Sequence, residues 1–246
     1  MILVGITGAI GHGKSTLADM LIQADPVAVH LESFYIIAEV VDGLHDATVT
    51  VPTPDVAALN QWLKPLPDIL QRVTGQKYSF KQIKLDPEHI TDHPVLYEKL
   101  FAHIKLLQKR PELIKHHINQ ENKTTYRPML QWVGGYLPKK LDPGIWYGEL
   151  VRRADAAGQQ GAKLCVIGGV RYPIDADVIR DAGGKVIKIY RPGMKQAHLS
   201  DPTERERDNI QVDSTMINDG SLRDLSKNAE KLLADLRANR LKPRYN

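Results

Sequence analysis

Residues 8–15, Gly-Ala-Ile-Gly-His-Gly-Lys-Ser, have the types and spacing of a phosphate-binding loop: a glycine, four residues, then glycine, lysine and serine. Glycines let backbone N–H groups approach phosphate oxygens, a following helix aims its positive dipole end at them, and the lysine adds a mobile positive charge. The serine hydroxyl coordinates Mg²⁺. We therefore expect a site for ATP or GTP with Mg²⁺, in which Ser15 is the metal ligand. The residues assigned to this site are Gly8, Ile10, Gly11, His12, Gly13, Lys14, Ser15 and Thr16.

A triphosphate site alone does not define the acceptor, because kinases, GTPases and motor ATPases share this loop. The sequence has no Asn-Lys-x-Asp guanine-binding motif, and its 246 residues are few for a ring ATPase with its accessory domain. The pattern therefore favours a small kinase that uses ATP and Mg²⁺, with Lys14 as a catalytic residue.

The loop needs a strand before it and a helix after it. Ile2–Ile6 is a short β-branched run that predicts a strand, and Lys14–Ala24 carries apolar residues at helical spacing. Val27–Leu31 is mostly apolar, as expected of a strand buried on both faces of a parallel sheet. The chain therefore begins with a strand, helix, strand unit.

The rest of the chain divides by composition. Prolines break the segment from about 45 to 125 into short helical pieces, which we interpret as a helical insert on the acceptor side, lying over the sheet. After this segment, stretches typical of helices and strands alternate again. The sequence thus predicts an α/β, three-layer P-loop nucleotide-kinase fold with a mostly parallel sheet, divided into 1–44, 45–125 and 126–246. The expected later elements are helices near 128–136, 142–157, 173–182 and 222–239 and strands near 163–167, 185–190 and 213–217.

Composition places the chain among globular proteins. It carries 33 Lys and Arg against 29 Asp and Glu, a net charge of +4, which is low for a protein that coats DNA. No stretch approaches the roughly 18 apolar residues that span a bilayer, and the first residues lack the basic leader of a signal peptide. The single cysteine, Cys165, lies in an apolar run and is expected to be buried. We expect a cytoplasmic protein without membrane partners.

Two further segments resemble a known family. Arg127–Gly134, Arg-Pro-Met-Leu-Gln-Trp-Val-Gly, and then Asp142–Trp146 resemble the R-x-x-L-Q-x-x-G and D-x-x-x-W signature of the bacteriophage deoxynucleoside monophosphate kinases. Val170–Pro192, with Val-Arg-Tyr-Pro and Gly-Gly-Lys-Val-Ile, looks like the same family's next stretch. His198–Ser200 and Ile217–Leu222 resemble its last landmarks. The resemblance covers 1–20 and about 127–235, and dephospho-coenzyme A kinase has a similar C-terminal half.

The resemblance implies ATP-dependent phosphoryl transfer to a nucleotide 5′-phosphate. Arg127 and Arg171 match family arginines and would bridge donor and acceptor phosphates, since such transfer depends on positioning and charge neutralisation. The alternative for each is a surface ion pair. Arg191 begins a lid-like segment at about 191–212, and Asn218 matches the family residue near the donor base, although Asn-Asp-Gly also forms ordinary turns.

The sequence departs from the family at two acids. Gly168-Gly169 stands where the family has an aspartate before Val-Arg, and Ser33–Ala38 lacks the aspartate and proline of the family's Phe-Ala-Asp-Pro-Leu-Lys. Another acid or water must then complete the magnesium shell. Glu32, directly after a predicted strand, is a candidate general base, which a hydroxyl acceptor needs and an ionised phosphate does not. Its alternative is a solvated residue at a helix start.

Three functions are therefore open. The first is transfer of the γ-phosphoryl group of ATP to a deoxynucleoside monophosphate. The second is phosphorylation of a hydroxyl, on a hydroxymethylated pyrimidine in DNA or on a coenzyme precursor, which would make DNA a substrate. The third is a nucleotide-binding module without catalysis. The insert could serve as a lid, as the surface of a homodimer or as an arm that contacts DNA.

Overall fold

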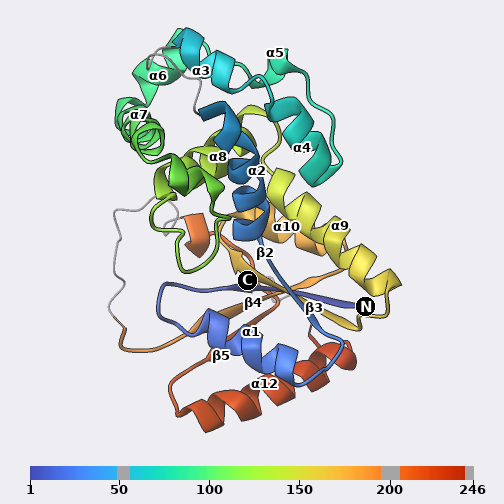
Figure 1. Ribbon diagram of the computed structural model, residues 1–246. Helices are drawn as coiled ribbons and strands as arrows, with labels where there is room; N and C mark the ends of the chain where they lie inside the picture. The colour runs from blue at the N-terminus through green and yellow to red at the C-terminus, as the bar shows by residue number, and fades with distance from the viewer. Residues whose placement is uncertain (49–55, 195–205, 242–246) are drawn as a thin grey trace. The chain divides into compact units, whose positions relative to one another are not determined.

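The computed structural model describes residues 1–48, 56–194 and 206–241. The chain divides into an α/β unit, Met1–Ser33 with Tyr147–Asn246, and a helical unit, Phe34–Trp146. The helical unit is longer than the insert expected at 45–125, because it includes α8 (Arg127–Lys140) and nearly all of α2 (Ser33–Thr48). Figure 1 shows both sets of elements.

The α/β unit is built on a parallel five-stranded sheet, which confirms the predicted fold class. Its strand order is β2-β3-β1-β4-β5. The connection from β1 runs toward one edge and that from β4 toward the other, so the topology reverses between these neighbours, where open α/β sheets bind ligands outside the carboxyl ends of the strands. The strands are β1 (Ile2–Thr7), β2 (Val29–Glu32), β3 (Leu164–Val170), β4 (Lys185–Tyr190) and β5 (Ser214–Ile217).

Helices cover both faces of this sheet (Figure 1). Against one face pack α1 (Lys14–Gln23) and α12 (Leu222–Arg237), whose leucines share a buried core with β1, β3 and β4. Against the other face packs α10 (Pro173–Asp181), so closely that a Cβ on Gly5 would lie 2.7 Å from Ile179 Cδ1. α9 (Ile145–Gln159) leads into β3. Burial on both faces explains why β1 and β3 are almost continuously apolar. The edge strands β2 and β5 are only partly buried and carry polar residues, so the expected burial of Val27–Leu31 on both faces was wrong.

Two strands begin or end at other residues than the sequence predicted. β3 continues past Ile167 to Val170, because Gly168 pairs with Glu32 of β2 and Val170 pairs with Thr7 of β1. Gly169 lies at the irregularity in the pairing with β1 and has a φ of 73°. β2 begins at Val29 rather than Val27, because the Asp25 carboxylate accepts a hydrogen bond from the Val27 N–H and holds a turn there. Cys165 is buried in β3, as predicted.

The helical unit has an aromatic core. Trp132 stacks on Tyr136 with ring centroids 4.6 Å apart and lies 5.4 Å from Trp62. The Tyr136 hydroxyl donates to the Ile83 carbonyl, so its polar end is satisfied inside the core. The other helices are α3 (Val56–Trp62), α4 (Leu66–Thr74), α5 (Phe80–Ile83), α6 (Pro87–Asp92), α7 (Pro94–Lys109) and the 3₁₀ helix η1 (Pro111–Lys115).

Prolines start several of these helices, where the missing N–H costs nothing. Of the helices in the described part of the chain, none combines the length and the apolar character needed to cross a membrane.

His103 is buried inside the helical unit, 4% exposed, with its ring edge against Tyr126. Burial and the neighbouring His45 lower its pKa from 6.5 to about 4. The folded protein therefore keeps this imidazole neutral at a pH where the unfolded chain binds the proton.

This burial predicts a loss of stability in acid. Protonation of the unfolded chain begins near pH 6.5, so the contribution of His103 is fully present above that pH and is lost toward pH 4, by about 3 kcal/mol. We expect His103→Leu to flatten this part of the pH dependence, measured by urea unfolding at several pH values. His116→Leu, at an exposed histidine of the same unit, is the control; an equal flattening in both variants would contradict the prediction.

Candidate functional site

The loop at residues 8–13 connects β1 to α1 and has a backbone that only glycine adopts easily. Gly8, Gly11 and Gly13 have φ angles of 147°, 81° and 99°. A Cβ on Gly8 would lie 2.4 Å from the Ile189 carbonyl oxygen, and one on Gly13 would lie 2.7 Å from Asn218 Nδ2. The loop thus packs its bare backbone on the ends of β4 and β5 and leaves its N–H groups near the start of α1 for a ligand.

Lys14 begins α1 and curls back over the loop. Its ammonium group donates hydrogen bonds to the carbonyls of Gly8 and Ala9, both at 2.8 Å. Ser15 follows on the exposed side of the first turn of α1. The donors of the loop, the lysine charge and an accessible hydroxyl suit phosphate groups with a bound Mg²⁺.

His12 links the loop to the end of β4. Its ring is buried at 3% exposure, its Nδ1 accepts a hydrogen bond from the Arg191 N–H at 3.3 Å, and it meets the Tyr190 ring edge-on. Burial, with smaller contributions from Lys14 and other cations, lowers the pKa of His12, which keeps the imidazole neutral and able to accept this bond. The His12 carbonyl in turn accepts a hydrogen bond from Asn218 Nδ2 at 3.0 Å.

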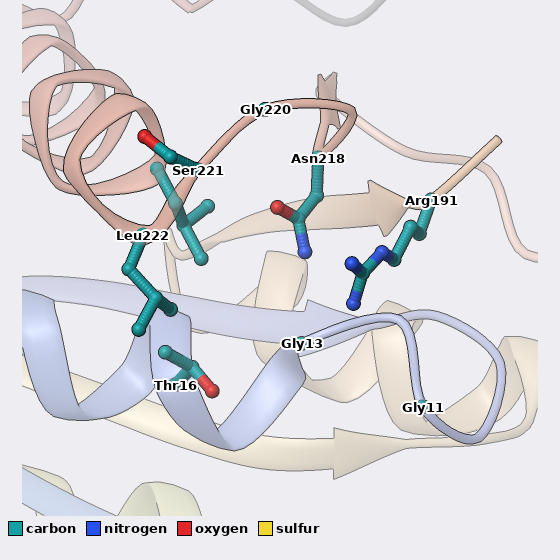
Figure 2. Close-up of a pocket in the computed structure, with 9 residues that line it drawn as sticks. Gly11, Gly13, Thr16, Arg191, Asn218, Gly220, Ser221 and Leu222 are labelled. Atoms are coloured by element: carbon teal, nitrogen blue, oxygen red, sulfur yellow. The ribbon is translucent and has the colours of Figure 1, made fainter.

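A cavity of about 340 Å³ opens beside the loop (Figure 2). It brings together five of the residues assigned from the sequence: Gly11, Gly13, Thr16, Arg191 and Asn218. Ile10 is 61% exposed and takes no part in lining it. The far wall was not foreseen and comprises Gly220, Ser221, Leu222 and Leu225, at the start of α12. Gly220, Ser221 and Leu222 belong to the segment 217–222 that resembles a family landmark, but of that segment only Asn218 was assigned to the site.

Arg171 follows directly after β3, at the carboxyl end of the sheet. The backbone around it is held from three sides. The Tyr147 hydroxyl donates to the Gly169 carbonyl and the Thr7 hydroxyl to the Val170 carbonyl, both at 2.8 Å. The Asp175 carboxylate accepts the N–H groups of Arg171 and Tyr172, both at 3.0 Å.

The Arg171 guanidinium itself is exposed and has no hydrogen-bond or ion-pair partner within residues 1–48, 56–194 and 206–241. A surface ion pair therefore does not account for this arginine in the described structure. The sequence analysis did not predict roles for Asp175 and Tyr147. Asp175 stands three residues after Tyr172, in a helix that begins with proline, and this spacing is typical of an acid that caps a helix.

Glu32 ends β2 and lies opposite Gly168 in the sheet. Its Oε1 is 2.9 Å from the place where a Cβ on Gly168 would be, and 3.5 Å from His30 Nε2. The glycine thus makes room for the carboxylate of the neighbouring strand. The Glu32 side chain is about one-quarter exposed, at 27%, which leaves part of its carboxylate accessible at the strand ends.

Ser15 and Glu32 are the candidate protein ligands for Mg²⁺ in the α/β unit. Both offer oxygen, which this ion prefers. Among the residues that the structure describes, no three His, Cys, Asp or Glu side chains are grouped to hold a metal.

Arg127 belongs to the helical unit, where it is the first residue of α8. Its side chain is exposed and, like that of Arg171, makes no hydrogen bond or ion pair with any described residue. Half of the lid-like segment expected at 191–212, residues 195–205 with the landmark His198–Ser200, lies outside the described residues.

The sequence model of one protein family, Deoxynucleotide monophosphate kinase, matches residues 73–229. The match begins inside the segment 45–125, which the motifs quoted above do not cover. It leaves out the loop at 8–15, whose geometry is therefore a separate observation. No curated protein matches the chain.

The loop geometry predicts that Gly13→Ala will impair nucleotide binding. The new Cβ would meet the Asn218 amide, and a φ of 99° costs a residue with a side chain about 1–2 kcal/mol. We expect the Kd for Mg²⁺-ATP, measured by calorimetry, to rise at least about tenfold. Gly161→Ala is the matched control, because its φ is 103° and its Cβ meets open space. Similar Kd values for the Gly13 variant and the wild type would contradict the prediction.

Proposed function

The chain belongs to the deoxynucleotide monophosphate kinase family, and we propose that it transfers the γ-phosphoryl group of ATP to the 5′-phosphate of a (deoxy)nucleoside monophosphate. The observation that carries this proposal is the loop at residues 8–15 with its adjoining cavity. Because the loop lies outside the residues that match the family, it supports the use of a nucleoside triphosphate independently.

The donor would bind along the loop and in the cavity. Backbone N–H groups at the start of α1 and the Lys14 ammonium group would bind its phosphates. Asn218 and Arg191 line the cavity and would contact its base and sugar. The volume of about 340 Å³ lies at the small end of the range for ligand pockets. Mg²⁺, when bound with Ser15 as a ligand, would neutralise charge on the phosphate oxygens.

The acceptor phosphate requires positive charge that is not already held in an ion pair. Arg171, at the end of β3, and Arg127, at the start of α8, both meet this condition within the described structure. Transfer of a phosphoryl group to a phosphate consists largely of bringing two anions together, so arginines that bridge them would supply most of the catalysis. Arg171 belongs to the α/β unit and Arg127 to the helical unit.

A transfer assay tests the proposal and its alternatives. Purified protein is incubated with γ-labelled ATP and Mg²⁺ on a panel of deoxynucleoside monophosphates, and in parallel on duplex DNA with and without hydroxymethylated pyrimidines. We expect label on at least one free monophosphate. We expect Lys14→Ala to lower kcat/KM by at least about a hundredfold, because it removes the charge beside the transferred phosphoryl group.

The other outcomes distinguish the alternatives. Label on DNA alone would replace the proposal with a kinase that acts on hydroxyl groups. ATP binding without transfer to any acceptor would indicate a module that binds nucleotides without catalysis. An unchanged rate with Lys14→Ala would assign any transfer to a contaminant.

Glu32→Gln separates the two kinase chemistries. An acceptor phosphate is already ionised and needs no base, so with a monophosphate we expect kcat to fall less than about tenfold if Glu32 acts only on the metal shell. A hydroxyl acceptor would lose about a hundredfold or more, because a general base contributes 10²–10⁴. The measurement is kcat at saturating ATP over pH 6–9. A loss of that larger size with a monophosphate would contradict the role assigned to Glu32.

A further inference from the structure

Arg171 has to be held in place by its backbone. Its guanidinium makes no hydrogen bond or ion pair in the described part of the chain, although its charge acts on the Asp175 carboxyl. No such bond therefore fixes its orientation before substrate binds. An arginine on a flexible segment would lose conformational entropy at each binding event. The peptide groups on either side of Arg171 are, however, held by buried side chains.

Three side chains form this support. Thr7, Tyr147 and Asp175 are 1%, 4% and 5% exposed, and they come from β1, α9 and α10. Their bonds to the Gly169 and Val170 carbonyls and to the N–H groups of residues 171 and 172 are those described above. Every residue from 169 to 172 therefore has one backbone group bound by a buried side chain.

We propose that Asp175, together with Tyr147 and Thr7, is a positioning residue that holds the peptide groups of residues 169–172 and so directs the Arg171 guanidinium toward the acceptor phosphate. This inference rests on the proposed function and deepens it. In this proposal Asp175, Tyr147 and Thr7 affect acceptor binding only through the position of Arg171.

A comparison within the chain distinguishes this role from ordinary helix capping. In α12 the acid at the corresponding position, Asp224, accepts the backbone N–H of Ser221, the residue before the helix, and is exposed. In α10 Asp175 accepts the same bond and also that of Arg171, one residue further from the helix. The second bond contributes nothing to the helix and instead fixes the segment that bears the arginine.

Burial of the ionised Asp175 carboxylate costs free energy, because the charge is removed from water. It raises the pKa of this carboxyl to about 6, against the lowering effect of its two N–H bonds and of Arg171. An exposed cap such as Asp224 avoids that cost, so capping alone gives no reason to bury the acid. The Tyr147 phenol is buried as well, and burial raises its pKa well above the usual value, so it stays protonated and able to donate to the Gly169 carbonyl.

A double-mutant cycle tests the inference. Asp175→Ala, Arg171→Ala and the double variant are assayed with the monophosphate found in the transfer assay, at pH 8, where Asp175 is ionised. We expect Asp175→Ala to raise the acceptor KM by about 10- to 100-fold, with the ATP KM changed less than about twofold. In the Arg171→Ala background we expect no further increase, because the carboxylate acts only through the arginine.

Conservative variants keep the test independent of folding. Asp175→Asn retains an oxygen acceptor, and we expect its acceptor KM within about threefold of the wild type. Tyr147→Phe removes one hydroxyl, and we expect a smaller increase that likewise disappears without Arg171. Asp25→Ala is the matched control, since Asp25 is a buried acid of the same unit that accepts the Val27 N–H at the opposite end of the sheet. It should lower the melting temperature and leave both KM values unchanged.

The outcomes separate the two proposals. An unchanged acceptor KM in Asp175→Ala and Tyr147→Phe, or increases that persist in full without Arg171, would overturn the positioning role while the kinase activity stands. Absence of transfer by the wild-type protein would overturn the proposed function itself, and the positioning role with it.

Discussion

The backbone of the loop at residues 8–13 lies directly on the carboxyl ends of β4 and β5, with no room for a side chain between them. The Ile189 carbonyl and the Asn218 amide occupy the places where Cβ atoms of Gly8 and Gly13 would stand. The shape of the loop is therefore set by strands far along the chain as well as by β1 and α1. Because β4 packs in one core with α1 and α12, the interior of the α/β unit also fixes the anion site.

Local patterns were sufficient to predict the elements of this unit. The loop sequence has a fixed relation to the strand before it and the helix after it, and both were found where expected. The other strands were recognised because parallel strands buried on both faces must be nearly all apolar, as in Leu164–Ile167 and Val186–Ile189. Asn218 and Arg191 were placed beside the loop by family resemblance alone, and the cavity includes both.

Features that depend on strand pairing could not be predicted. Gly168 was interpreted as the loss of an acid, whereas the register between β2 and β3 makes it the space into which Glu32 fits. Nothing in either segment alone indicates this pairing across more than a hundred residues. The roles of Asp175 and Tyr147 could not be predicted either, because they depend on the segment 169–172 that follows β3. Nor could the position of Leu222 and Leu225 in the wall of the cavity.

The proximity of the Ser33 hydroxyl to the Tyr147 phenol has a consequence for chain topology. These two residues are the ends of the α/β unit between which the helical unit of about 110 residues is inserted. Joining the ends of a flexible loop of that length would cost about 4 kcal/mol of chain entropy beyond a constant. Since the two ends already lie near each other within the α/β unit, the fold of this unit itself brings them together. The length of the inserted segment could therefore change without opening the sheet.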